Sequence, residues 1–252
     1  MKRDRYDLTG KMALVSGASG GLGAHFSDVL ARCGAKVVLA ARRLEQLEAQ
    51  AARIGAMGGA CSTVALDVTR PDSIAALAPL LEEVDILVNN AGIVRESMAL
   101  EHAEADWDAV MDTNLKGMFL LAQAGAKAMR GGGRGGSIIN IASVLGQRQA
   151  AGVVSYAVSK AGVIQLTKLL ALEWARYGIR VNALAPGYLA TEINSDFWNS
   201  EGGKALIKRI PQRRLGQLED LDGPLLLLAS DASAYMTGSV IAIDGGHAVS
   251  TL

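Results

Sequence analysis

Short apolar runs of strand length recur along the chain, and longer segments with a helical period separate them. Near-continuous apolar strands are typical of parallel sheets that helices cover on both faces, because both faces of each strand are then buried. The alternation predicts an α/β fold with a doubly wound parallel sheet of about seven strands. The predicted strands are Met12–Ser16, Lys36–Ala40, Ala60–Ala65, Ile86–Asn89, Ser137–Ile141, Arg180–Ala185 and Ser239–Ile243.

The longest helical patterns span Glu104–Met129 and Tyr156–Tyr177, and Gly178 is placed to end the second one. Asn114 lies within the first pattern although Asn is a poor helix former, so we expect a local reason for it. Residues 191–214 gather polar, glycine and charged residues around Phe197 and Trp198, which predicts an excursion from the sheet and a candidate substrate lid. No internal repeat or domain boundary is visible, so residues 1–252 are expected to form a single domain.

The composition excludes several classes of function. The chain has 252 residues, 50% of them hydrophobic, and its 25 basic residues balance 25 acidic ones. A formal net charge of zero argues against binding to nucleic acid or an anionic membrane surface. No apolar run reaches the roughly 18 residues of a membrane span, and the first residues lack the apolar core of a secretory signal. Two cysteines and three scattered histidines provide neither a disulfide framework nor a metal site, so we expect a cytoplasmic location.

A glycine-rich loop follows the first predicted strand and precedes a helical pattern that runs to Arg32. Glycines let the backbone turn tightly and let a pyrophosphate approach the positive end of a helix. Glycines alone are equally consistent with an ordinary strand–helix turn. The position at the first strand favours a nucleotide site. The loop contains Gly17, Ser19, Gly21, Leu22 and Gly23, and its glycines have the spacing GxxxGxG.

Tyr156 and Lys160 are four residues apart and therefore lie on the same side of a helix. An ammonium about 4 Å from a phenol favours the phenolate by roughly 4 kcal/mol at an effective dielectric constant near 20. That would lower the pKa of the tyrosine by about three units, toward the range in which a general acid–base catalyst works best. The spacing alone does not distinguish such a pair from one on a helix surface.

Further polar and turn-forming residues follow the predicted strands. Asn90-Ala91-Gly92 comes directly after the fourth strand, Ser143 after the fifth, and Pro186-Gly187 after the sixth. The carboxyl ends of parallel strands meet at one edge of the sheet, which is where open α/β folds bind ligands. These residues are therefore expected to surround one site.

Together, these motifs resemble the short-chain dehydrogenase/reductase family in order and spacing over essentially the whole chain, and Asp244-Gly245-Gly246 matches the family's usual ending. The resemblance implies that Tyr156 exchanges a proton with the carbinol oxygen and that Ser143 hydrogen-bonds this oxygen. Lys160 would lower the pKa of the tyrosine and hold the nicotinamide ribose, and Asn114 would hold a water that links Lys160 to solvent. The residues expected to contact the cofactor are Gly17, Ser19, Gly21, Leu22, Gly23, Arg42, Asp67, Val68, Asn90, Ala91, Gly92, Tyr156, Lys160, Pro186, Gly187, Tyr188 and Thr191.

The end of the second predicted strand indicates which cofactor is used. Ala41 stands where NAD-specific relatives usually carry an acid, and Arg42 and Arg43 follow it. A guanidinium can bind a phosphate through two charge-assisted hydrogen bonds, so the sequence predicts NADP(H), with Arg42 as the main ligand of the 2′-phosphate. Two solvated arginines at the start of a helix are the alternative.

The implied reaction is hydride transfer between NADP(H) and a small ketone or secondary alcohol, without metal. Among the resembled enzymes, 3-oxoacyl-carrier-protein reductases usually present basic docking residues; Arg130 is a candidate, but Leu172 stands where a second arginine is common. A sugar or polyol dehydrogenase and a catalytically silent nucleotide-sensing regulator are the alternatives. The resemblance also implies a homotetramer in which the two long helices form one interface.

Overall fold

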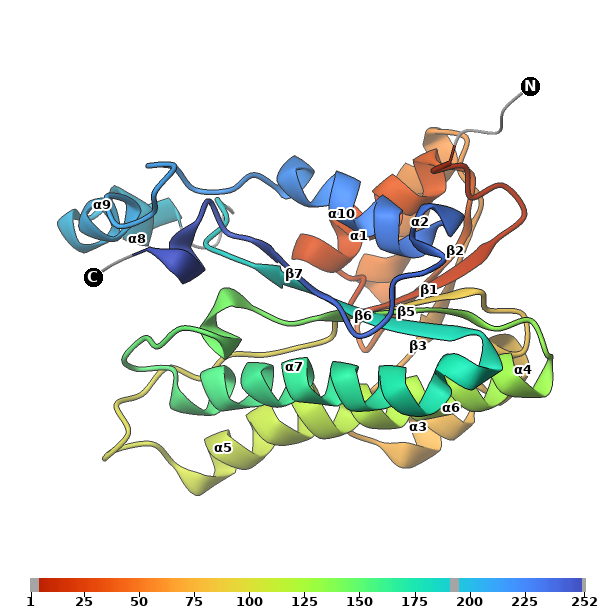
Figure 1. Cartoon of the computed structure of the whole chain (residues 1–252), viewed down its shortest axis with the longest axis horizontal. Coiled ribbons are helices and arrows are strands. Elements are labelled where there is room, and N and C mark those ends of the chain that lie inside the picture. Colours follow the sequence, from red (N-terminus) through yellow and green to blue (C-terminus); the bar gives the residue numbers. More distant parts are fainter. Residues whose placement is uncertain (1–4, 191–194, 251–252) are drawn as a thin grey trace.

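The computed structural model describes residues 5–190 and 195–250, apart from the side chains of Ser195 and Phe197. One seven-stranded parallel sheet has the order β3-β2-β1-β4-β5-β6-β7 (Figure 1). The chain reverses its direction of winding between β1 and β4, and the carboxyl ends at such a reversal form a natural crevice for a ligand. The predicted fold class is confirmed. The strands are β1 (Met12–Ser16), β2 (Lys36–Ala41), β3 (Cys61–Ala65), β4 (Ile86–Asn89), β5 (Gly136–Ile141), β6 (Ile179–Pro186) and β7 (Val240–Ile243).

Helices cover both faces of the sheet and bury apolar side chains on each face (Figure 1). Successive residues of a strand point to opposite faces, so Val15 joins one core while Leu14 joins the other. One core lies beneath α1 (Gly21–Arg32), α2 (Leu44–Ala56) and α10 (Asp222–Ala229). The other lies beneath α3 (Pro71–Ala75), α4 (Ala78–Leu81), α6 (Met118–Gly131) and α7 (Val154–Trp174).

The long helix predicted for Glu104–Met129 has the expected extent, but it is not uniform. It consists of α5 (Glu104–Met111), the π-helical turn η1 (Asp112–Gly117) and α6. Asn114 and Gly117 both lie in this wide turn, which commonly marks a functional site. A Cβ atom at position 117 would come within 2.6 Å of the carbonyl oxygen of Val68, so glycine allows η1 to pack against the loop after β3.

The second long helix agrees closely with the prediction. Helix α7 continues into a short 3-10 turn, η3 (Ala175–Tyr177), and Gly178 ends it with φ 72°. Its inner side buries Ser159 and Lys160, while Leu172 is 79% exposed on its outer side. No helix in the described part of the chain is long and apolar enough to span a membrane.

The described part of the excursion expected at residues 191–214, which is residues 195–214, lies beyond the carboxyl edge of the sheet (Figure 1). It contains α8 (Ser195–Asn199) and α9 (Glu201–Ile207), while Thr191 lies outside the described residues. The described residues also contain the short 3-10 turns η2 (Val144–Gly146), η5 (Leu218–Leu221), η6 (Asp231–Ser233) and η7 (His247–Val249).

Candidate active site

The glycine loop leaves the start of α1 open to an anion. Its N-cap, Gly20, makes no side-chain cap, and no acidic residue occupies the first turn, so backbone N–H groups remain at the positive end of the helix. Gly17 and Gly21 have φ values of 69° and 53°. A Cβ atom on Gly23 would lie 2.2 Å from the carbonyl oxygen of Gly17, so the close contact of loop and helix requires glycine.

A hydrogen-bond network joins the loop after β1 to the loop after β4. The Ser16 hydroxyl oxygen accepts hydrogen bonds from the backbone N–H groups of Asn90 (3.0 Å) and Ala91 (3.1 Å). In return, the Asn90 side-chain amide donates to the Ser16 carbonyl oxygen (3.1 Å). Asn90 thus joins the two loops, and its place along the cofactor stays a prediction. The sequence analysis missed Ser16, although a polar residue at the end of an apolar strand could have signalled it.

The two arginines after β2 have different partners. Arg43 donates a hydrogen bond from Nη2 to the Ser19 hydroxyl (3.0 Å) and therefore reaches the glycine loop. Desolvation tends to raise the pKa of Asp67, but hydrogen bonds from Thr69 and the charges of Arg42 and a neighbouring arginine hold it below its usual value. Arg42 therefore acts on the loop after β3, and Arg43, to which the prediction gave less weight, is the one that contacts the glycine loop.

Ser143 and Tyr156 come together at the carboxyl edge of the sheet. Ser143 lies two residues after the end of β5 and caps η2, and Tyr156 lies in the first turn of α7. Burial raises the pKa of the Tyr156 phenol, and a hydrogen bond with the Ser143 side chain only partly opposes this effect. The phenol is therefore protonated near neutral pH and can donate a proton.

Lys160 lies beneath the Tyr156 ring, with its Nζ atom 5.6 Å from the ring centroid. This Nζ atom donates to the carbonyl oxygen of Ile141 (2.7 Å), and the residue is only 3% exposed. Burial lowers the pKa of Lys160 to about 8. The expected lowering of the phenol pKa by this ammonium does not appear in the structure, because burial disfavours charge on both groups and Lys160 is directed to a backbone carbonyl.

Asn114 connects the loop after β4 to α7. Its Oδ1 accepts from the Ile93 N–H (2.8 Å), and its Nδ2 donates to the Ile93 carbonyl oxygen (2.8 Å) and to the Ser159 hydroxyl (3.1 Å). Ser159 in turn donates to the carbonyl oxygen of Tyr156 (2.7 Å). The polar side chain at a wide helical turn thus positions the residues around it. Ser159 was missed by the sequence analysis, which considered only the tyrosine and lysine of this motif.

The end of β6 forms a further wall of the site. A Cβ atom on Gly187 would lie 2.7 Å from the Asp244 Cα atom, so glycine lets β6 approach the residues after β7. The Tyr188 ring makes edge contacts with the rings of Trp198 and His247, and the distances between ring centroids are 5.3 Å and 5.4 Å. A cavity of about 320 Å³ opens on this side and is lined by Tyr188, Gln212, Arg214, Gly216, Asp220 and Ala242–Gly246, without any of the four predicted catalytic residues.

A parallel sheet with an uncapped helix start, a glycine-rich loop and a partly buried tyrosine beside a buried lysine defines a Rossmann-type oxidoreductase. A family model described as enoyl-(acyl carrier protein) reductase matches residues 17–248. The chain therefore belongs to the short-chain dehydrogenase/reductase family, as the motifs predicted, and it is an enzyme that acts on CH–OH groups.

Several known proteins are similar to it over nearly their whole length. The gluconate 5-dehydrogenase of Gluconobacter oxydans (strain 621H) is 41% identical over 252 residues, which cover 98% of both chains. A 3-oxoacyl-(acyl-carrier-protein) reductase of Vibrio cholerae is 39% identical over 244 residues, covering 95% of this chain and 98% of the relative. The crystal structure of a gluconate 5-dehydrogenase from Burkholderia cenocepacia J2315 in complex with NADP and tartrate has a TM-score of 0.93 and 38% identity, and the match covers 98% of this chain and 99% of that one.

Proposed function

We propose that this enzyme reversibly transfers a hydride between NADP(H) and a ketone or secondary alcohol, with Tyr156 as the proton donor and acceptor. The observation that carries the proposal is the partly buried Tyr156 phenol, which is hydrogen-bonded to Ser143 at the carboxyl edge of the sheet and whose pKa is raised by desolvation. Bound NADP(H) supplies or accepts the hydride, while the protein orients the substrate and moves the proton. Ser143 is the second group that holds the substrate oxygen.

Lys160 and Asn114 support this chemistry in different ways. A lysine with a pKa of about 8 carries its charge at neutral pH and can hold a ribose hydroxyl while it stabilises a developing phenolate. Asn114 positions the loop after β4 through Ile93. The relay water expected beside Asn114 stays a prediction.

The residues around the crevice fit a dinucleotide. Positive φ values in the glycine loop and the uncapped start of α1 suit a pyrophosphate. The residues proposed to hold the adenine are Asp67 and Val68, and those proposed along the nicotinamide half are Asn90–Gly92 and Pro186–Tyr188. Thr191, expected beside the nicotinamide, keeps that role as a prediction.

The cofactor is NADP(H), and we expect Arg43 to contribute more to this preference than Arg42. Ala41 ends β2 without an acidic side chain that would repel a 2′-phosphate, and the hydrogen bond from Arg43 to Ser19 brings a guanidinium to the glycine loop. One pair of variants tests this point. Arg43→Ala should raise the KM for NADPH about tenfold and leave that for NADH nearly unchanged, since a charge-assisted hydrogen bond contributes about 1.5–3 kcal/mol.

Arg176→Ala is the matched control, because this exposed arginine lies in η3, before the amino end of β6, and donates to the Tyr177 hydroxyl instead of contacting the glycine loop or the loop after β3. Arg42→Ala should have a smaller effect on NADPH than Arg43→Ala. Equal use of NADH and NADPH by the wild type, or an unchanged ratio in both arginine variants, would contradict the assignment.

The substrate class is tested by NADPH oxidation with a panel of 3-oxoacyl thioesters, β-keto esters, aryl ketones and keto sugar acids. Similarity to both gluconate dehydrogenases and 3-oxoacyl reductases makes these the informative substrates. Turnover of any carbonyl compound, abolished in Tyr156→Phe, supports the proposal and excludes the silent regulator. Leu172, 79% exposed where a second docking arginine is common, argues against delivery by a carrier protein.

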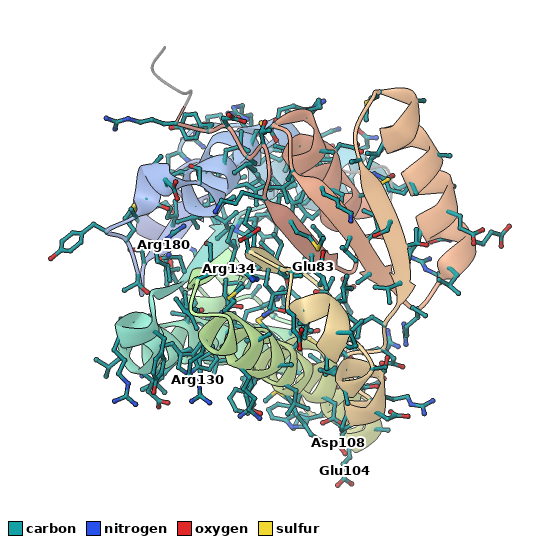
Figure 2. All side chains as sticks on the ribbon, turned by 90° about the vertical axis from the view of Figure 1, so that its right-hand side faces the viewer. Glu83, Glu104, Asp108, Arg130, Arg134 and Arg180 are labelled. Carbon is teal, nitrogen blue, oxygen red and sulfur yellow. The ribbon has the colours of Figure 1, made fainter. Side chains whose placement is uncertain are left out.

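We further propose one domain, a lid at residues 191–214, a cytoplasmic location and a homotetramer. The packing of both helix layers on one sheet supports the single domain, and a chain with only two cysteines fits a reducing compartment. For assembly, acidic Glu104 and Asp108 lie at the start of α5 and Arg130 at the end of α6, on the side of the helix layer that faces away from the sheet (Figure 2).

A two-fold axis that sets these helices antiparallel would bring the acidic end of one protomer to the basic end of its partner. Light scattering after gel filtration tests this: Asp108→Lys should weaken assembly, and adding Arg130→Glu should restore part of it. A monomeric wild type would overturn the proposal.

A further inference from the structure

A buried histidine follows the last strand and has no role in the chemistry described so far. His247 begins η7 and is only 4% exposed, and its Nδ1 atom is buried without a hydrogen-bond partner among the described residues. An unpaired buried polar atom costs about 1–3 kcal/mol. Such a cost is retained in a native fold for a reason, and a ligand that accepts the missing hydrogen bond is one.

The imidazole contacts a residue that is proposed to lie along the nicotinamide half of the cofactor. Its ring contacts the edge of the Tyr188 ring, which follows Pro186 and Gly187 at the end of β6. On its other side, Tyr188 contacts Trp198 of α8, within the proposed lid. His247 is therefore linked through the Tyr188 ring to the loop after β6 and to α8 of the proposed lid.

A guanidinium with neutral partners lies beside the imidazole. Arg148 belongs to the loop that begins with Ser143 and leads into α7. Its Nη1 atom donates to the carbonyl oxygens of His247 (2.6 Å) and Ser250 (3.0 Å) and to the Ser250 hydroxyl (3.0 Å). Among the described residues, no carboxylate forms an ion pair with Arg148. The loop of Ser143 thus brings an uncompensated positive charge to the histidine.

Asp244, the acid that acts on His247, does not neutralise the charge of Arg148. Asp244 accepts hydrogen bonds from the backbone N–H groups of Gly246 (2.9 Å) and Ala248 (2.7 Å). Burial and the positive charges of Arg148 and Arg209 lower the pKa of His247, although Asp244 opposes them. The imidazole is therefore neutral near pH 7 and can present an N–H group, so one fixed cation and one neutral donor are available together.

We propose that Arg148 and His247 bind a carboxylate of the substrate, so that the enzyme acts on hydroxy acids and keto acids in preference to uncharged ketones. A carboxylate has two oxygens, which suit one guanidinium and one imidazole N–H. The carboxylate would lie at the end of the substrate away from the carbinol carbon that Tyr156 serves. This inference rests on the proposed function and names its substrate class.

Two substitutions at His247 separate binding from packing. His247→Phe keeps a ring against Tyr188 but removes the donor, whereas His247→Asn keeps an N–H donor. Rates are compared for 5-keto-D-gluconate and for D-fructose, an uncharged keto sugar. His247→Phe should raise the KM for the keto acid about tenfold with little change in kcat, as expected for loss of a hydrogen bond to a charged group, and leave fructose unaffected. His247→Asn should recover most of this loss.

His102→Phe is the matched control, because both ring nitrogens of His102 also lack partners but it lies in the loop before α5. Its kinetics should equal those of the wild type. Equal losses for both substrates in His247→Phe would mean that the ring only packs, and equal wild-type use of acid and uncharged ketone would overturn the carboxylate site. Preference for a phosphorylated ketose over the keto acid would also overturn it.

Gluconate binding by a catalytically inactive variant tests the carboxylate site separately from the proposed reaction. D-gluconate is titrated into Tyr156→Phe, and the tryptophan fluorescence is followed because Trp198 lies beside Tyr188. Binding that His247→Phe weakens about tenfold supports the carboxylate site even when no carbonyl compound is reduced, and such inactivity would refute only the proposed reaction. Turnover of ketones without gluconate binding would refute only the carboxylate site.

Discussion

Replacing Lys160 with Met should change stability in a way that depends on pH. The folded protein lowers the pKa of Lys160 from 10.5 to about 8, because burial disfavours the ammonium. Below about pH 8 the lysine is charged in both the folded and the unfolded state, and the folded protein bears the full cost of burying that charge. A difference of about 2.5 pKa units corresponds to about 3 kcal/mol of the free energy of unfolding.

The direction of this pH dependence follows from the number of protons that the folded and unfolded chains bind. Between about pH 8 and 10.5 the unfolded chain binds more protons than the folded one, so this group makes the wild type more stable as the pH rises. Met has no charge to bury, but it leaves the Ile141 carbonyl oxygen without the hydrogen bond that Lys160 donates, a loss of about 1–3 kcal/mol. At pH 7 the variant should therefore be more stable by about 1 kcal/mol, and at pH 10.5 less stable by about 2 kcal/mol.

Urea denaturation, followed by circular dichroism at several pH values without cofactor, measures this difference. Comparison of the two proteins at each pH removes the contributions of every other titrating group. A difference in the free energy of unfolding that stayed constant from pH 7 to 10.5 would refute the reasoning, because it would mean that the folded protein does not shift the pKa of Lys160.

Three further substitutions test the site. Tyr156→Phe should leave NADPH binding intact, measured by cofactor fluorescence, and reduce turnover about 10²–10⁴-fold; more than about a tenth of wild-type activity would contradict the assignment. Gly23→Ala should abolish NADPH binding in the same fluorescence measurement, because the new Cβ atom would lie 2.2 Å from the Gly17 carbonyl oxygen. Wild-type affinity in this variant would contradict the prediction. Asn114→Ala should lower the free energy of unfolding by about 2–4 kcal/mol in urea, since Ile93 would lose both hydrogen-bond partners; a loss below about 0.5 kcal/mol would contradict this.

Much of the fold could be read from the sequence because the signals are local. The apolar period identified every strand of the sheet, and Gly178 marked the end of α7. The place of the glycine loop followed from the rule that a nucleotide binds where the first strand meets the first helix. The tyrosine–lysine spacing was equally readable, because four residues make about one turn of a helix.

The sequence did not reveal how the long helix Glu104–Met129 is built. Asn114 and Gly117 were recognised as poor helix formers, but the π-helical turn that holds them depends on Val68 and Ile93, which belong to other loops. Nor did the spacing of Tyr156 and Lys160 reveal their protonation. Desolvation of both groups depends on how completely the rest of the chain covers them.

The proposed carboxylate site could not be predicted from the sequence either. Arg148 and His247 are 99 residues apart, and neither has a neighbour in the sequence that marks it as a ligand. Likewise, Arg42 and Arg43 are adjacent in the chain, and only the position of Ser19 on a different loop distinguishes them. The sequence by itself determined the strands, the turns and the spacing of reactive groups, because these depend on backbone geometry over a few residues. The tertiary structure decided burial, pKa and partner choice, because these depend on contacts between residues far apart in the chain.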